Sequence, residues 1–296
     1  FQFYFDDKTN FRTELIRNFN QEQNKGFTNK GRMAKCLLSG DPINYETKTN
    51  YIASTNDQEI LTIQYFDNKK KKYRTITEKD KELFKNASKT FDEKKIEFEK
   101  NELIPNEDIL AGYRKENSLW YYGITKHSEF FNKRQLLFLI TVVKNIQLVL
   151  KNIDDTKYAS ALSCYLSFFL CRAVNHNSLG TVWDSTTDSA KQTLEFKQMQ
   201  FVPMHPEINP FAKQGPTLEN MKKTIKTSLQ FCVMKSKKIT RIENKSVLVS
   251  EEEKNYDIIL TDPPYSSDVQ YGEQSEFFYV WVYRVSKHYF QELPKR

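Results

Sequence analysis

The residues of this chain best suited to chemistry are Asp262, Pro263, Pro264 and Tyr265. The Asp262 carboxylate and the Pro263 carbonyl would each accept one N–H from an amine, which draws the nitrogen towards tetrahedral geometry and frees its lone pair. The two prolines fix φ and restrict the residue before each of them, so the acceptors are held rigidly. Tyr265 offers a flat face on which an extruded base can stack. This corner, Asp262–Tyr265, therefore predicts methyl transfer to an exocyclic amine of a nucleobase.

A proline turn with an exposed tyrosine is the alternative interpretation, because Asp-Pro pairs readily start turns. The preceding residues favour catalysis. Asp257–Leu260 has the aliphatic pattern of a buried parallel strand. Ligands in open α/β sheets bind just beyond the carboxyl ends of such strands. We therefore expect a buried strand that leads directly into the corner.

The composition indicates a substantial core and a basic surface. The chain has 296 residues, 39% of them hydrophobic, and a formal net charge of +7. Positive charge favours a polyanionic partner, although a moderate excess is weak support by itself. None of the four cysteines forms a Cys-x-x-Cys pair, so we expect no metal and a reduced, cytoplasmic protein. The apolar runs at 136–150 and 158–174 are too short to span a bilayer, so we expect buried helices and no membrane partner.

Hydrophobic periodicity organises the rest of the chain. It predicts helices at 78–100, 129–151, 156–175, 217–235 and 273–289. We expect His176 to close the third of these helices rather than to act as a base. We divide the chain into a polar basic insert at 1–105 that could take part in target recognition, a helical region at 106–240, and a catalytic strand, corner and following helix at 241–296.

Two basic blocks are candidates for binding phosphate groups. The first follows two aromatic residues and predicts a hairpin with a basic tip. The second lies between residues 213 and 245, where nine basic residues face two glutamates. A solvated loop and a solvated helix face are the respective alternatives, and both stay open. The candidate nucleic-acid-binding residues are Lys69, Lys70, Lys71, Lys72, Lys222, Lys223 and Lys226.

The segment from Thr261 to Arg284, TDPPYSSDVQYGEQSEFFYVWVYR, resembles a family of large prokaryotic adenine-specific DNA methylases. Many members carry a zinc-ribbon insert, and some occur with phage-defence genes. Segments 35–43, 117–134, 182–184 and 209–211 fit the same family, so the resemblance covers most of the chain from about residue 31 to 284. It implies an α/β fold: part of a class I, Rossmann-like methyltransferase sheet with a largely helical insert. It also implies methyl transfer from S-adenosylmethionine to the N6 amine of adenine in double-stranded DNA.

The chain departs from that family in two respects. The zinc-ribbon cysteines are missing, since Cys36 stands alone. The family's glycine-rich cofactor loop is missing as well, because no two of the eight glycines are separated by a single residue. We therefore expect an internal piece of a longer enzyme, or a split subunit whose second chain or segment supplies that loop. The sequence does not identify the cofactor-binding residues.

Two further functions fit the same residues. Cytosine N4 presents almost the same amine as adenine N6, so Asp262 does not separate the two bases. Related corners in glutamine methylases usually begin with Asn, and those of RNA adenine methylases often end in Trp, so Asp first and Tyr last favour DNA. The chain could also be a non-catalytic DNA-binding or scaffold subunit that keeps the corner as a turn. The missing glycine loop favours this last interpretation.

Overall fold

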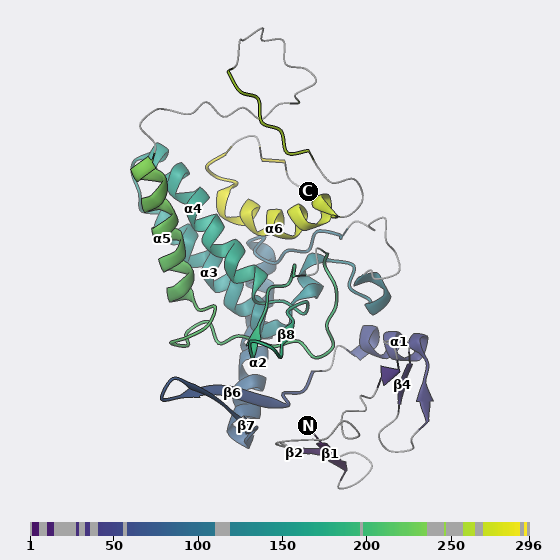
Figure 1. Cartoon of the computed structure of the whole chain (residues 1–296). Helices are drawn as coiled ribbons and strands as arrows, with labels where there is room; N and C mark the ends of the chain where they lie inside the picture. Colours follow the sequence, from purple (N-terminus) through teal and green to yellow (C-terminus); the bar gives the residue numbers. More distant parts are fainter. Residues whose placement is uncertain are drawn as a thin grey trace.

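Helices make up the body of the molecule in the computed structural model, and the labelled strands lie in its lower half (Figure 1). The structure describes residues 2–5, 11–14, 28–29, 33–35, 41–55, 58–109, 119–195, 198–235, 246, 257–263, 269–290 and 293–294.

The helices predicted from periodicity are confirmed. They are α2 (Glu78–Lys100), α3 (Lys133–Lys151), α4 (Thr156–Asn175), α5 (Leu218–Lys235) and α6 (Tyr271–Ser286). Their starts follow from local capping. The Asn132 side chain accepts from the Gln135 backbone N–H and Gln135 reciprocates, so α3 begins later than periodicity predicts. A separate 3-10 turn, η3 (His127–Phe130), occupies the residues before it. Asp155 caps α4 by accepting from the first backbone N–H groups of that helix.

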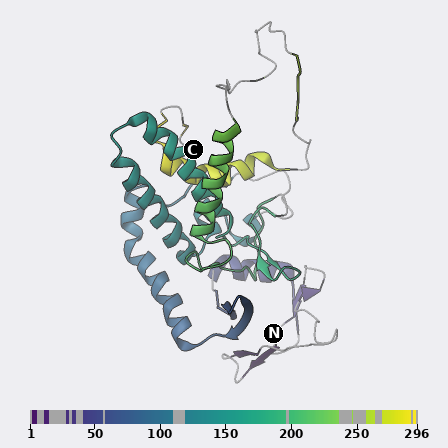
Figure 2. The ribbon, with the colours of Figure 1, turned by 60° about the vertical axis from the view of Figure 1, so that its left-hand side comes forward.

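The core lies where α4 packs against α3, α5 and α6, and α2 packs along the other side of α3 (Figure 2). An aromatic cluster joins η3 to α6. Phe131 stacks on Phe277 with ring centroids 6.0 Å apart, and it meets Trp281 edge-on at 5.4 Å. Phe277 and Trp281 are fully buried. Because α2 packs on α3, the helical core crosses the expected boundary at residue 105, and the three-part division of the chain stays a prediction.

The sheets among the described residues are small and antiparallel. One pairs β1 (Gln2–Phe5) with β2 (Phe11–Glu14), and another orders β3 (Thr28–Asn29), β4 (Met33–Lys35) and β5 (Pro42–Ile43). The other two are the hairpins β6 (Thr62–Asp67) with β7 (Lys70–Thr75), and β8 (Trp183–Asp184) with β9 (Ser189–Ala190). A short helix, α1 (Tyr45–Thr55), packs on the 3-10 turn η2 (Leu119–Tyr122). The parallel sheet of a class I methyltransferase is not among these pairings and stays a prediction.

A buried arginine fixes α6, the helix that follows the corner, to the rest of the core. The Arg284 side chain is 5% exposed and forms an ion pair with Glu107 at 2.9 Å. Its guanidinium also donates to the carbonyls of Leu103 and Ile104 in the loop after α2. A buried guanidinium is tolerated only when its donors are satisfied, and here they are. This clamp sets the position of α6.

Candidate functional site

The predicted corner follows an exposed segment rather than a buried strand. Residues 257–263 adopt no regular secondary structure. Ile258 and Ile259 are each 75% exposed, and Leu260 is 90% exposed. The prediction of a buried strand at Asp257–Leu260 is therefore wrong for the structure as described, because no described strand pairs with this segment and no described helix covers it. The aliphatic pattern of residues 246–249 predicts a second strand, which lies outside the described residues except for residue 246.

The structure describes two residues of the predicted corner. Asp262 and Pro263 are both exposed. Pro264 and Tyr265 lie outside the described residues, so the stacking surface cannot be placed beside them. In Figure 1 the segment lies above α6, on the opposite side of that helix from the labelled strands. The acceptors are thus presented on the helical end of the molecule.

The described glycines do not form a cradle for S-adenosylmethionine. A Cβ at Gly123, whose φ is +71°, would lie 2.7 Å from the Ala53 Cβ, and one at Gly180 would lie 2.5 Å from the Phe130 ring. These two glycines therefore serve close packing within the chain. Gly215 and Gly272 stand singly, with open space around them. The described residues do not fit the cofactor, so we assign no step of a reaction to it here.

The predicted basic hairpin is present, and its lysines fall into two groups. Lys71 Nζ donates to the carbonyls of Thr187 (2.7 Å) and Asp188 (2.6 Å), in the turn between β8 and β9. Lys72 forms an ion pair with Asp67. Lys69 and Lys70 are exposed at the tip and form no ion pair within the described part of the chain. Two of the four predicted phosphate-binding lysines are therefore already engaged.

The lysines predicted on the 217–235 helix lie on the exposed side of α5. Lys222, Lys223 and Lys226 are all exposed, whereas Met221 on the same helix is buried against the core. Lys222 pairs with Glu219 one turn earlier at 2.7 Å. An exposed pair of this spacing contributes only about 0.3–0.5 kcal/mol, so it yields readily to a phosphate. In both Figure 1 and Figure 2 the hairpin lies below α5.

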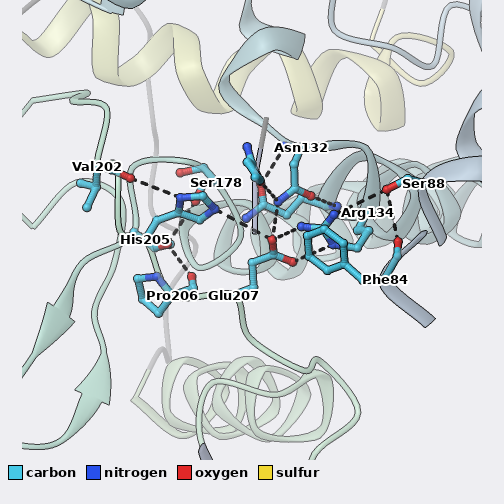
Figure 3. Close-up of polar contacts among 12 residues, drawn as sticks. Phe84, Ser88, Asn132, Arg134, Ser178, Val202, His205, Pro206 and Glu207 are labelled. Carbon is cyan, nitrogen blue, oxygen red and sulfur yellow. Dashed lines mark hydrogen bonds and ion pairs between the residues drawn. The ribbon is translucent and has the colours of Figure 1, made fainter. Parts of the chain in front are cut away.

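A partly exposed polar network that periodicity does not reveal ties the proline-rich loop before α5 to α2 and α3 (Figure 3). Glu207 lies between His205 and the guanidinium of Arg134, which also stacks on the Phe84 ring. Burial alone would raise the pKa of Glu207, but hydrogen bonds from His205 and Arg134 lower it below its usual range. The Asn132 side chain donates to Glu207 as well. The charged and polar groups of the network pair with one another, so the network holds the loop against α2 and α3.

The Asn132-x-x-Gln135 spacing is the one sequence signal that points to this network, because it predicts the capping box at the start of α3. Nothing in the sequence pairs Arg134 with Glu207. The segment 117–134, which carries part of the family resemblance, supplies Asn132 and Arg134 to the network. The segment 209–211 contacts α3 through Phe211, whose ring centroid lies 6.3 Å from that of Phe138.

The buried histidines among the described residues are poorly suited to base catalysis near neutral pH. His176 is the C-terminal cap of α4, as predicted. Burial lowers its pKa to about 4, with a smaller contribution from Arg172. Burial likewise lowers the pKa of His127 to about 4, opposed by Glu107 and assisted by Arg284. A base with so low a pKa accepts a proton weakly at neutral pH.

Metal-binding and membrane-spanning features are absent from the part of the chain that the structure describes. No group of three or more His, Cys, Asp or Glu side chains within it is placed to hold a metal ion. None of its helices combines the length and the apolar character that crossing a membrane requires. Comparisons with protein-family models, with curated proteins and with solved structures found no match to the chain. Fold class and activity therefore rest on the residues themselves.

Proposed function

We propose that the chain carries the base-accepting corner of a DNA amino-methyltransferase, with adenine N6 as the methyl acceptor and S-adenosylmethionine as the methyl donor. In this proposal the Asp262 carboxylate and the Pro263 carbonyl each accept one N–H of the target amine. Pro264 holds the turn, and Tyr265 stacks on the extruded base. The donor is already reactive, so positioning of the amine supplies most of the acceleration and little acid–base chemistry is needed.

The observation that carries the proposal is the exposed aliphatic run that leads into an exposed carboxylate. Consecutive residues of a strand point to opposite faces, so Ile258, Ile259 and Leu260 make both faces of the segment apolar. Such runs belong to strands that are covered on both sides. These three side chains are 75% to 90% exposed, so nothing described covers either face of the run. We infer that a sheet supplied by a second chain or a further segment covers this run and holds the cofactor.

Duplex DNA is the proposed substrate because exposed lysines on the β6–β7 hairpin and on α5 provide positive charge for its phosphates. Neutralising phosphates releases counterions, so DNA binding should weaken steeply as salt rises. The corner does not distinguish adenine from cytosine, since both present an exocyclic amine. Adenine N6 is the preferred acceptor because the residues around the corner resemble adenine-specific enzymes.

A non-catalytic DNA-binding subunit is the second candidate. It is favoured by the described glycines, which pack within the chain or stand singly rather than forming a cofactor cradle. In such a subunit Asp262 would be a turn residue, and its removal would leave every activity of the assembly unchanged.

Substitution of Asp262 by Ala separates the two candidates, with Asp257→Ala as the matched control. Both aspartates are exposed and lie in the same segment, so the two variants lose the same charge. The tagged protein is purified from its own cells together with whatever binds it, and methyl transfer to an AT-rich duplex is measured. We expect Asp262→Ala to lose about 100-fold or more of the rate, because a directed acceptor is removed, while DNA binding is unchanged. Equal rates for the two variants would refute the catalytic role.

A further inference from the structure

The β6–β7 hairpin has the form of a free-standing ribbon. It is a two-stranded sheet, and no other described strand pairs with either edge. Its turn residues Asn68 and Lys69 have φ values of +49° and +66°, as a tight type I′ turn requires. Figure 1 shows the ribbon projecting at the lower left, away from the helices α3 to α6. Such a ribbon presents its tip and one face to a partner.

One face of the ribbon is fastened to the body of the protein at the β8–β9 hairpin, mainly through Asp188. Gln64 donates to the carbonyl of Asp188 at 3.1 Å, and the Tyr73 hydroxyl donates to its carboxylate. Lys71 donates to the same carbonyl. Tyr73 also meets the ring of Trp183 edge-on, with centroids 6.3 Å apart. These side chains alternate along the strands and therefore share one face, the inner face.

The base of the ribbon is fastened as well. Arg74 on β7 forms two hydrogen bonds to the carboxylate of Asp80, at 2.6 and 2.8 Å. Asp80 belongs to the first turn of α2, where it forms a capping box with Thr77. A bidentate guanidinium–carboxylate pair fixes orientation as well as distance. The ribbon is thus a rigid arm that is held at two points rather than a loosely tethered loop.

The tip and the outer face, opposite the inner one, remain available. In the strand register Tyr65 lies opposite Lys72, and Asp67 lies opposite Lys70, all on the outer face. Tyr65 is 39% exposed. Lys69 and Lys70 have no ion-pair partner in the described part of the chain, and Asp67 is the one carboxylate on the ribbon itself. This surface is complementary to a polyanion.

We propose that the β6–β7 ribbon enters the major groove of duplex DNA, with Lys69 and Lys70 on the flanking phosphates and Asp188 holding the ribbon at the required angle. The major groove of B-form DNA, about 12 Å wide, admits a two-stranded ribbon, whereas the minor groove, about 6 Å wide, must first be widened at an energetic cost. The deep, narrow major groove of an RNA duplex excludes it. This inference rests on the proposed function in one respect, namely that the substrate is duplex DNA.

The first experiment measures equilibrium binding of the whole chain to an AT-rich DNA duplex and to the RNA duplex of the same sequence over a salt series. We expect the DNA duplex to bind more tightly. For Lys69→Gln/Lys70→Gln we expect the magnitude of the salt slope to fall by about 1.8 with DNA, because two phosphate contacts are lost. Lys94→Gln/Lys100→Gln, on exposed positions of α2, removes the same charge and should leave the slope unchanged. Equal binding of DNA and RNA, or equal effects of the two double variants, would overturn the groove assignment.

The second experiment tests Asp188 as a positioning residue through Asp188→Asn. This change removes a negative charge, so long-range electrostatics alone predicts tighter DNA binding. The ribbon proposal predicts the opposite: weaker DNA binding and a smaller preference for DNA over RNA, because Tyr73 loses a charged acceptor. Tighter binding with an unchanged preference would show that Asp188 does not hold the ribbon in its binding orientation.

Neither experiment depends on catalysis, so the two proposals fail separately. If the protein transfers methyl groups but substitution of Lys69 and Lys70 has no effect on DNA binding, the ribbon proposal is refuted and the methyltransferase proposal stands. If the ribbon binds DNA selectively but the protein transfers no methyl group, the methyltransferase proposal is refuted and the ribbon proposal stands.

Discussion

Replacing Arg284 by Met should destabilise the protein more than any exposed substitution. The Arg284 side chain is 5% exposed and its partner Glu107 is 17% exposed. Removing one member of a buried ion pair leaves the other charge uncompensated, which costs about 3–5 kcal/mol. The carbonyl of Leu103 loses its donor at the same time, whereas the Ile104 carbonyl keeps the Asn106 backbone N–H. Since a domain is typically stable by about 5–15 kcal/mol, this single change removes a large part of the total.

A double-mutant cycle separates the part of the lost stability that comes from the unpaired Glu107 charge from the part that comes from the lost carbonyl hydrogen bond. In Arg284→Met/Glu107→Gln no buried charge is left unpaired, so part of the loss should return. The orphaned Leu103 carbonyl still costs about 1–3 kcal/mol, so the double variant should stay less stable than the wild type. Lys287→Met is the control. It breaks an ion pair with Glu102, which is 49% exposed, and such a pair contributes about 0–1 kcal/mol.

Urea unfolding followed by circular dichroism gives the free energies of unfolding for the wild type, Arg284→Met, Glu107→Gln, the double variant and Lys287→Met. An unchanged urea dependence would show that the folded and unfolded states have kept their compactness. If Arg284→Met costs no more than Lys287→Met, the buried clamp does not hold α6. The position of the helix after the corner would then have another origin.

Three further predictions concern acid stability, thiol reactivity and the hairpin turn. Because the pKa of His127 is lowered to about 4, His127 binds a proton below pH 6.5 in the unfolded chain but stays neutral in the folded chain until the pH approaches 4. Stability should therefore fall by up to about 3 kcal/mol between pH 6.5 and 4, and His127→Gln should flatten that fall in urea unfolding; an unchanged slope would contradict this. Burial raises the pKa of Cys171 to about 12, so iodoacetamide should modify the exposed Cys232 long before Cys171, and comparable rates would show that Cys171 is accessible. Lys69→Gly should slow amide exchange in the hairpin, since it relieves left-handed backbone strain of about 1 kcal/mol; faster exchange would count against the type I′ turn.

The helices were predictable because each buries an apolar stripe with a period near 3.6 residues, and α2, α3 and α4 also begin at recognisable caps. The α4 helix was predicted to the residue, since Asp155 caps it and His176 closes it. The start of α3 was predicted too early, at residue 129, because Phe130 and Phe131 extend the apolar pattern although residues 127–130 form a 3-10 turn.

Long-range polar contacts could not be predicted in the same way. Arg284 and Glu107 are far apart in the chain, and their pairing follows from the packing of α6 against the loop after α2 rather than from any local pattern. The same holds for Arg134 with Glu207. The strand predicted at Asp257–Leu260 failed for a different reason, because a local pattern does not supply the neighbouring strands that a buried strand needs. Its pattern specifies burial on both faces, yet burial requires neighbours that the described residues do not provide.

The identity of the methylated nucleoside tests the central claim most directly. The protein, purified from its own cells with its bound partners, is incubated with duplex DNA and S-adenosylmethionine carrying a deuterated methyl group. The DNA is then digested and analysed by mass spectrometry. The account predicts deuterated N6-methyladenine in the wild-type reaction and none with Asp262→Ala. Label in N4-methylcytosine would move the acceptor to cytosine, and no labelled base with DNA still bound would contradict the assignment of Asp262 as an amine acceptor.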